Sequence, residues 1–171
     1  MTGVANDALN VLFLCTGNSA RSILAEAILD RKGAGRFRAF SAGSRPRGEV
    51  HPAALALLEQ CGFSTTGLRS KSWEEFAGAG APPLDLIITV CDNAAGESCP
   101  IWPGHPVTAH WGIEDPAEVE GEDRAQPFRS AFETLEQRIG LLVALPAEAL
   151  DPGLLQARVR SIAAEAESTL G

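Results

Sequence analysis

The sequence predicts a three-layer α/β fold in which a short parallel sheet is flanked by helices. Apolar segments typical of buried strands alternate with segments in which apolar residues recur at helical spacing. The apolar run at residues 84–90 surrounds the single charge of Asp85, as expected of a parallel strand that is buried on both faces. Because 171 residues suit one hydrophobic core, we expect a single domain over residues 1–171, with residues 1–8 flexible.

Each element of this fold has its own signal in the sequence. Apolar runs predict buried strands at residues 10–14 and 84–90, and residues 37–40 and 107–111 are expected to form two further short strands. Helical apolar spacing predicts helices at residues 22–31, 52–61, 126–145 and 152–170. His51-Pro52 suits the start of the second helix and Gly62 suits its end. Cys61 falls in line with Ala54 and Leu58 on the apolar face of that helix, so we expect it in the core.

Composition narrows the function classes. The formal net charge of −8 argues against nucleic acid or an anionic membrane as a partner. No apolar run approaches the length of a membrane span, and the first residues lack the pattern of a signal peptide, so we expect a cytoplasmic protein, and we favour a monomer. Four cysteines in that compartment favour catalysis, redox chemistry or metal binding over structural disulfides.

The segment LCTGNSARS at residues 14–22 joins the first predicted strand to the first predicted helix. Gly17 and Asn18 tolerate positive φ, so this loop can turn its N–H groups inward, and the helix N-terminus adds its dipole. Arg21 adds a planar fork of donors suited to an oxyanion. The sequence therefore predicts a cradle for a tetrahedral anion, formed by Thr16, Gly17, Asn18, Ser19, Ala20, Arg21 and Ser22.

Cys15 lies at the base of this predicted cradle. The positive field that attracts an anion also favours the thiolate, the form that can attack the central atom of that anion. Ser22 can donate a hydrogen bond to the sulfur. The alternative is a buried cysteine in an ordinary strand-to-helix turn, with Arg21 at the surface.

Three further segments accompany the loop: Ser41-Ala42-Gly43, ITVCDNAAGESCP at residues 88–100 and HWGIEDP at residues 110–116. With them, residues 11–145 resemble the low-molecular-weight phosphotyrosine phosphatase superfamily and, within it, the thioredoxin-coupled arsenate reductases. The resemblance implies a four-stranded parallel sheet flanked by helices. It also implies that Asp115, before Pro116, is the general acid that protonates the departing oxygen. An ordinary Asx turn is the alternative for Asp115.

Cys91 distinguishes a reductase from a phosphatase. Cys91 directly follows one predicted strand as Cys15 follows another, and the carboxyl ends of parallel strands share one edge of a sheet. The resemblance implies that Cys15 forms an adduct with arsenate, that Cys91 displaces arsenite, and that Cys99 then takes over the disulfide. It implies arsenic detoxification as the role, phosphate and sulfate as substrate analogues, and thioredoxin or glutaredoxin with glutathione as the reductant.

The chain departs from the best-known members at two of these positions. Cys99 follows Cys91 by eight residues, one more than is usual, which leaves the partner of Cys99 open. A helix over that span would separate the two Cα atoms by roughly 12 Å, whereas a disulfide requires about 7 Å or less. We therefore expect a mobile redox loop that changes shape on oxidation. Ala20 replaces a cysteine of many relatives, which removes a competing disulfide to Cys15.

Lys71 is a third departure. In some relatives a potassium ion lies near the segment that matches residues 14–22, which we call the anion loop. The ion is held by groups that match Asn18, Glu26 and Ser41 and by an aspartate at the position of Lys71. An ammonium group there would exclude the cation by like charge. We expect Lys71 to take the role of the ion by pairing with Glu26 and supporting Asn18. The alternative is a solvated lysine in a loop.

Other classes explain less of the sequence. A tyrosine phosphatase typically has tyrosines after the Asp-Pro pair, whereas this chain has none and continues AEVEGE. A metal-binding module could use Cys91, Cys99, His105 and His110, but their spacing lacks the close pairs of structural zinc sites. An inactive oxyanion-binding protein would not need Cys15, Arg21 and Asp115 together. We therefore expect an arsenate reductase without metal or cofactor, and a phosphatase is the alternative.

Overall fold

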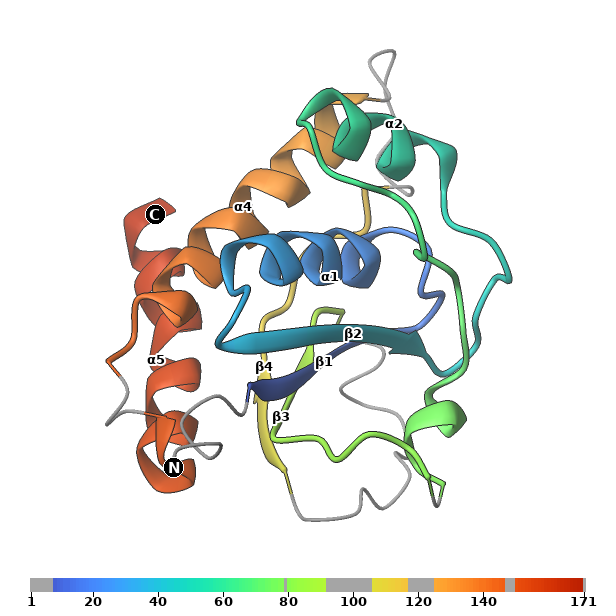
Figure 1. The fold of residues 1–171 in the computed structure, drawn as a ribbon. Coiled ribbons are helices and arrows are strands. Elements are labelled where there is room, and N and C mark those ends of the chain that lie inside the picture. The colour runs from blue at the N-terminus through green and yellow to red at the C-terminus, as the bar shows by residue number, and fades with distance from the viewer. Residues whose placement is uncertain (1–7, 79, 92–105, 117–124, 147–149, 171) are drawn as a thin grey trace.

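A parallel sheet of four strands forms the centre of the computed structural model, which describes residues 8–78, 80–91, 106–116, 125–146 and 150–170 (Figure 1). The strands lie in the order β2-β1-β3-β4, and every neighbouring pair is parallel. Their bounds are β1 Leu9–Cys15, β2 Phe37–Gly43, β3 Leu86–Thr89 and β4 Val107–His110. The predicted parallel α/β fold is confirmed. Of the segment expected to be flexible, residues 1–7 lie outside the described residues.

Within the described residues, four α-helices accompany the sheet in the predicted order: α1 Arg21–Lys32, α2 Pro52–Gln60, α4 Ala125–Val143 and α5 Pro152–Leu170. Helix α1 packs on β1, β2 and α4, and α5 packs on β4 (Figure 1). The 3₁₀ helix η2 at Trp73–Phe76 was not expected from the sequence; the side chain of Ser72 caps it by accepting from the Glu74 N–H. None of the helices in the described part of the chain is both long and apolar enough to cross a membrane.

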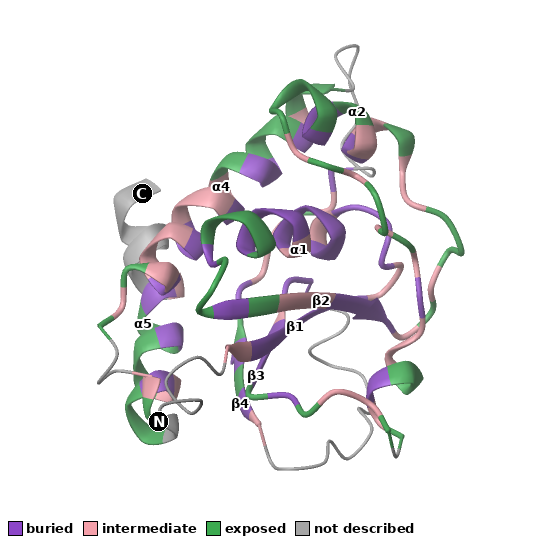
Figure 2. Cartoon of the chain, viewed as in Figure 1, coloured by how far each residue is buried: buried purple, intermediate pink, exposed green. Residues whose placement is uncertain are grey.

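The core lies on both faces of β1, the most buried strand (Figure 2). Val11 and Phe13 belong to the large cluster that packs against the α-helices. Leu12 and Leu14 belong to a smaller cluster beneath η2. The apolar residues of β3 are fully or almost fully buried, which confirms the prediction that this strand is covered on both faces.

Cys61 is exposed, so the prediction of a core position is wrong. Helix α2 ends at Gln60, and Cys61 is its C-cap, with its N–H donating to the Leu57 carbonyl at 3.0 Å. Gly62 then turns the chain away at a φ of +82°. The helical spacing of Ala54, Leu58 and Cys61 therefore did not predict burial of Cys61, because the helix ends one residue before it.

Candidate active site

The loop from Cys15 to Arg21 joins the last residue of β1 to the first residue of α1. Asn18 has a φ of 45°, as predicted, whereas Gly17 does not adopt positive φ. The Cys15 sulfur lies 3.0 Å from the Ser22 hydroxyl and accepts from the Asn18 backbone N–H at 3.3 Å. Ala20 at the helix N-cap has no side chain that can accept from the first-turn N–H groups, which leaves them suited to an anion.

Neighbouring segments hydrogen-bond to the outward-facing carbonyls of this loop. The Thr16 and Gly17 carbonyls accept from the backbone N–H groups of Arg45 and Arg47 at 2.9 and 3.0 Å. The Ser70 hydroxyl also donates to the Gly17 carbonyl, at 3.2 Å. In a trans peptide the N–H points opposite to the carbonyl, so the following N–H groups face the inside of the loop. This arrangement of backbone N–H groups is compatible with the predicted oxyanion cradle.

Asn18 ties the loop together through its side chain. Its amide donates to the Ser22 hydroxyl at 2.8 Å, and its carbonyl accepts from the backbone N–H of Lys71 at 2.8 Å. The side chain thereby connects Lys71 to the serine that contacts the Cys15 sulfur. These bonds account for a non-glycine residue at positive φ, because they offset the strain of that conformation.

A buried charged cluster lies behind the loop. The Lys71 ammonium lies 3.9 Å from Glu26 and donates to the Arg69 carbonyl at 2.8 Å and to the Ser41 hydroxyl at 3.4 Å. Ser41 in turn donates to the Glu26 carboxylate. Burial raises the pKa of Glu26, and burial lowers the pKa of Lys71 although Glu26 opposes that shift. Lys71 therefore lies beside Glu26 and Ser41, as the sequence analysis expected.

The structure shows why the Ser41-Ala42-Gly43 motif ends in glycine. It is paired with Cys15 in the register of β1 and β2. A Cβ at Gly43 would lie 2.4 Å from the Thr16 carbonyl oxygen and 2.9 Å from that of Cys15. Only glycine allows the backbone of β2 to approach the base of the loop this closely.

Arg21 links the loop to the segment that follows β4. Its guanidinium donates to the Ile113 carbonyl at 2.9 Å and lies 3.4 Å from the Asp115 carboxylate. Two hydrogen bonds hold that segment in place. The Ile113 N–H donates to the Val90 carbonyl, and the Trp111 indole donates to the Val159 carbonyl. The predicted clamp and the predicted acid are thus in direct contact, although 94 residues separate them.

Cys91 lies at the same edge of the sheet as Cys15. It is buried, and its sulfur lies 3.5 Å from the hydroxyl of Thr16, the residue that follows Cys15. Cys15, Cys61 and Cys91 form no disulfide with one another. The predicted resolving cysteine, Cys99, lies outside the described residues.

The metal-site alternative lacks a cluster in the described residues. No group of three or more His, Cys, Asp or Glu side chains in this part of the chain is arranged to hold a metal ion. The ring of His110 bonds to the Thr89 hydroxyl at 2.7 Å. Two of the four candidate ligands, Cys99 and His105, lie outside the described residues.

Some contacts of the site were not expected from the sequence. The backbone N–H groups of Arg45 and Arg47 donate to carbonyls of the loop. The backbone N–H of His51 likewise donates to the Ser19 carbonyl at 2.9 Å. Backbone donors leave no mark in residue identity, so no sequence pattern pointed to them.

The fold and this loop define a class: a parallel α/β protein with a cysteine at the start of a strand-to-helix loop and a carboxylate in contact with the arginine of that loop. A family model for low molecular weight phosphotyrosine protein phosphatases matches residues 10–151. The chain belongs to that family, which confirms the resemblance seen in its motifs.

Arsenate reductases are among the most similar relatives. The chain is 33% identical to an arsenate reductase of Bacillus licheniformis over 131 residues, which cover 75% of this chain and 91% of the relative. It is 31% identical to a glutaredoxin arsenate reductase of Synechocystis sp. over 134 residues, 78% of this chain and 95% of the relative. A solved arsenate reductase in the phosphate binding state matches with a TM-score of 0.66 and 30% identity, covering 80% of this chain and 97% of the other.

Proposed function

We propose that this protein reduces arsenate to arsenite in the detoxification of arsenic. The observation that carries the proposal is a second buried thiol, Cys91, at the edge of the sheet that carries the nucleophile. Phosphate ester hydrolysis would require only Cys15, Arg21 and Asp115. Reduction requires two electrons, and a pair of thiols can supply them by forming a disulfide.

The first step makes a thiol–arsenic adduct. The inward N–H groups of residues 16–22 and the guanidinium of Arg21 bind the arsenate oxygens, and Arg21 exchanges its contact with Asp115 for the anion. The Cys15 sulfur then attacks arsenic. A sulfur–arsenic bond forms, one arsenic–oxygen bond breaks, and the departing oxygen takes the proton of Asp115 and leaves as water.

The second step transfers the electrons. The Cys91 thiolate attacks the Cys15 sulfur, so that a sulfur–sulfur bond forms while the electron pair of the sulfur–arsenic bond goes to arsenic. Arsenic passes from As(V) to As(III) and leaves as arsenite. Thr16 supports this step because its hydroxyl contacts the Cys91 sulfur beside the nucleophile. We propose that Cys99 then displaces Cys15 from Cys91 and presents a Cys91–Cys99 disulfide to a dithiol reductant.

Lys71 is proposed to supply the permanent positive charge behind the loop, in the role that a bound cation has in some relatives. The supporting geometry is the buried contact of its ammonium with Glu26 and Ser41, and the bond from its backbone to Asn18. Potassium is therefore expected to leave turnover unchanged. A clear stimulation of turnover by potassium, compared with sodium at equal ionic strength, would contradict this role.

We further propose that the enzyme acts as a cytoplasmic monomer with thioredoxin as its reductant. A reducing compartment suits a relay that begins with reduced thiols, and Cys15 and Cys91 are not joined to each other by a disulfide. One of the relatives is named for glutaredoxin, which makes glutaredoxin with glutathione the competing reductant.

The decisive test is arsenate-dependent NADPH oxidation with thioredoxin and thioredoxin reductase. We expect Cys15→Ser, Cys91→Ser and Cys99→Ser each to stop turnover, while Cys61→Ser, the matched control at an exposed thiol, retains it. If Cys99→Ser alone continues to turn over, an external thiol resolves the first disulfide. If only glutathione with glutaredoxin supports the wild type, thioredoxin is the wrong reductant.

A phosphatase is the competing function, because the contact between Arg21 and Asp115 equally suits the cleavage of a phosphate ester. We expect only slow, Cys15-dependent hydrolysis of an aryl phosphate. Fast hydrolysis combined with no consumption of NADPH in the presence of arsenate would establish the phosphatase and refute the reductase.

A further inference from the structure

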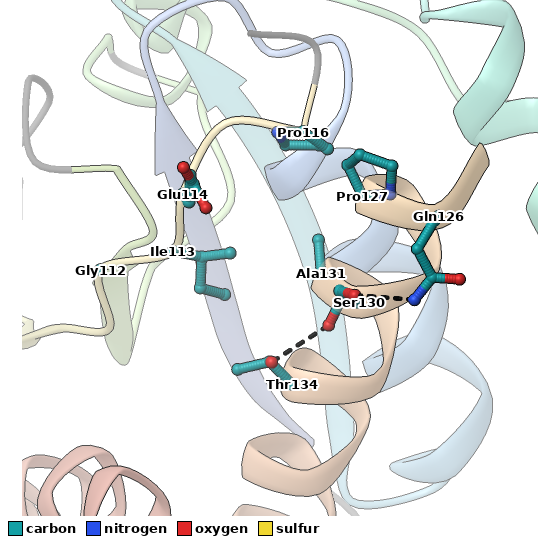
Figure 3. A pocket seen from close by; sticks show the side chains of 9 residues that line it. All are labelled: Gly112, Ile113, Glu114, Pro116, Gln126, Pro127, Ser130, Ala131 and Thr134. Carbon is teal, nitrogen blue, oxygen red and sulfur yellow. Dashed lines mark hydrogen bonds between the residues drawn. The ribbon is translucent and has the colours of Figure 1, made fainter. Parts of the chain in front are cut away.

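A cavity of about 400 Å³ lies behind the acid loop, which we define as residues 112–116 (Figure 3). Its other wall is the first part of α4. The residues that line it are Gly112, Ile113, Glu114, Pro116, Gln126, Pro127, Ser130, Ala131 and Thr134. None of them belongs to the anion loop, and a cavity of this volume is within the range that accommodates small organic ligands.

The acid loop separates this cavity from the active site. Ile113 lines the cavity with its side chain, while its carbonyl accepts from Arg21. Asp115 contacts Arg21, while the residues on either side of it, Glu114 and Pro116, line the cavity. An occupant of the cavity would therefore press on the segment that positions the acid, without touching the anion cradle.

The chemistry of the lining favours one class of ligand. Ile113 and Ala131 provide apolar surface (Figure 3). The Thr134 hydroxyl already donates to the Ser130 carbonyl at 3.1 Å, so its remaining capacity is that of an acceptor. Among the described residues that line the cavity, Glu114 is the only charged one, and it is exposed to solvent. The Gln126 amide and the Ser130 hydroxyl can donate as well as accept, so the charge of Glu114 decides the class of ligand. That carboxylate disfavours an anion and favours a ligand with positive charge.

We propose that this cavity is a second ligand site, which binds a small primary amine with an apolar body. The ammonium group pairs with Glu114, and the apolar body lies against Ile113 and Ala131. The net charge of −8 adds a long-range attraction for cations. Because the site shares the acid loop, its occupation shifts the segment that contacts Arg21 through Ile113 and Asp115.

The test is a titration of the intact, uniformly ¹⁵N-labelled protein with benzylamine, observed through backbone amide shifts. We expect saturable shifts at Ile113 and Ala131 with a dissociation constant in the millimolar range, as is ordinary for a fragment of this size. Benzyl alcohol should bind more weakly, because it lacks the charge. Benzoate should leave these amides unchanged.

Two variants and a control make the result specific. Glu114→Gln should weaken benzylamine about threefold to tenfold and leave benzyl alcohol unaffected, because only the ion pair is lost. Thr134→Trp should fill the cavity and abolish the shifts with both compounds. Glu133→Gln, an exposed carboxylate of the same helix that does not line the cavity, should match the wild type. Absence of saturable shifts, or equal binding of benzylamine by Glu114→Gln, would overturn the proposal whether or not the protein reduces arsenate.

Discussion

The two sides of the anion loop are built in different ways. On the reactive side, which we define as Arg21 and Asp115, the contacts are a hydrogen bond and an ion pair between partly accessible side chains. On the supporting side, which we define by Asn18, Gly43 and the Glu26–Ser41–Lys71 cluster, the contacts are buried and closely packed. In the proposed mechanism the reactive contacts exchange for substrate during each cycle, whereas the supporting contacts persist. Substitutions on the reactive side should therefore mainly lower kcat/KM, whereas substitutions on the supporting side should mainly lower the free energy of unfolding.

Arg21→Ala should give the largest loss of activity. Removal of the planar donor fork should lower kcat/KM for arsenate by about a thousandfold or more, because the neutral N–H groups alone must then hold the anion. The free energy of unfolding should change by only about 1 kcal/mol, since the ion pair with Asp115 is partly accessible. NADPH oxidation and urea unfolding measure the two effects. Arg21→Lys should recover little activity, and a large loss of stability would refute the division between the sides.

Gly43→Ala should give the largest loss of stability on the supporting side. The new Cβ would meet the Thr16 carbonyl oxygen at 2.4 Å, and neither strand can move without breaking the pairing of β1 with β2. We expect a loss of about 3 kcal/mol in urea unfolding. Gly17→Ala is the matched control in the same loop, because its Cβ meets the flexible side chain of Arg47 at 3.1 Å. An equal loss for the two variants would mean that the close approach at Gly43 is not the cause.

A comparison of Gly43 with the residues of the anion loop shows which features of this site a sequence can and cannot predict. Cys15, Asn18 and Arg21 were predictable because a strand, a turn and a helix follow one another within a few residues. The need for Gly43 depends on its register with Cys15, 28 residues away, and only the paired strands reveal it. The short motif around Gly43 pointed to this position, but it did not reveal why a glycine is needed there.

The remaining differences between prediction and structure have a similar origin. Cys61 was predicted to be buried because its spacing suits a helix, but the helix ends before the face is complete. The contact between Arg21 and Asp115 depends on how the segment after β4 returns to the sheet, which no local pattern encodes. The cavity behind the acid loop arises from the same tertiary packing and left no trace in the motifs.

Lys71→Met should lower stability by about 2 to 3 kcal/mol, because it leaves the carboxylate of Glu26 buried beside the Ser41 hydroxyl without its cation. Activity should fall less than in Arg21→Ala, since the backbone of Lys71 still donates to Asn18. The double variant Glu26→Gln/Lys71→Met should regain most of the lost stability. Urea unfolding of the three proteins checks this, and a double variant as unstable as the single one would show that Lys71 acts through packing alone.

The pH dependence of the same pair is the smallest effect and tests the balance between burial and pairing. Burial raises the pKa of Glu26 above 4.5, so the folded state binds the extra proton and wild-type stability falls as pH rises through that interval. Burial lowers the pKa of Lys71 below 10.5, so the unfolded state binds the extra proton and stability rises as pH approaches 10.5. Relative to Glu26→Gln/Lys71→Met, the wild type should therefore be least stable near neutral pH. The measurement is the difference in urea unfolding between the two proteins across that range. A maximum at neutral pH would mean that the attraction between Glu26 and Lys71 outweighs the cost of burying them.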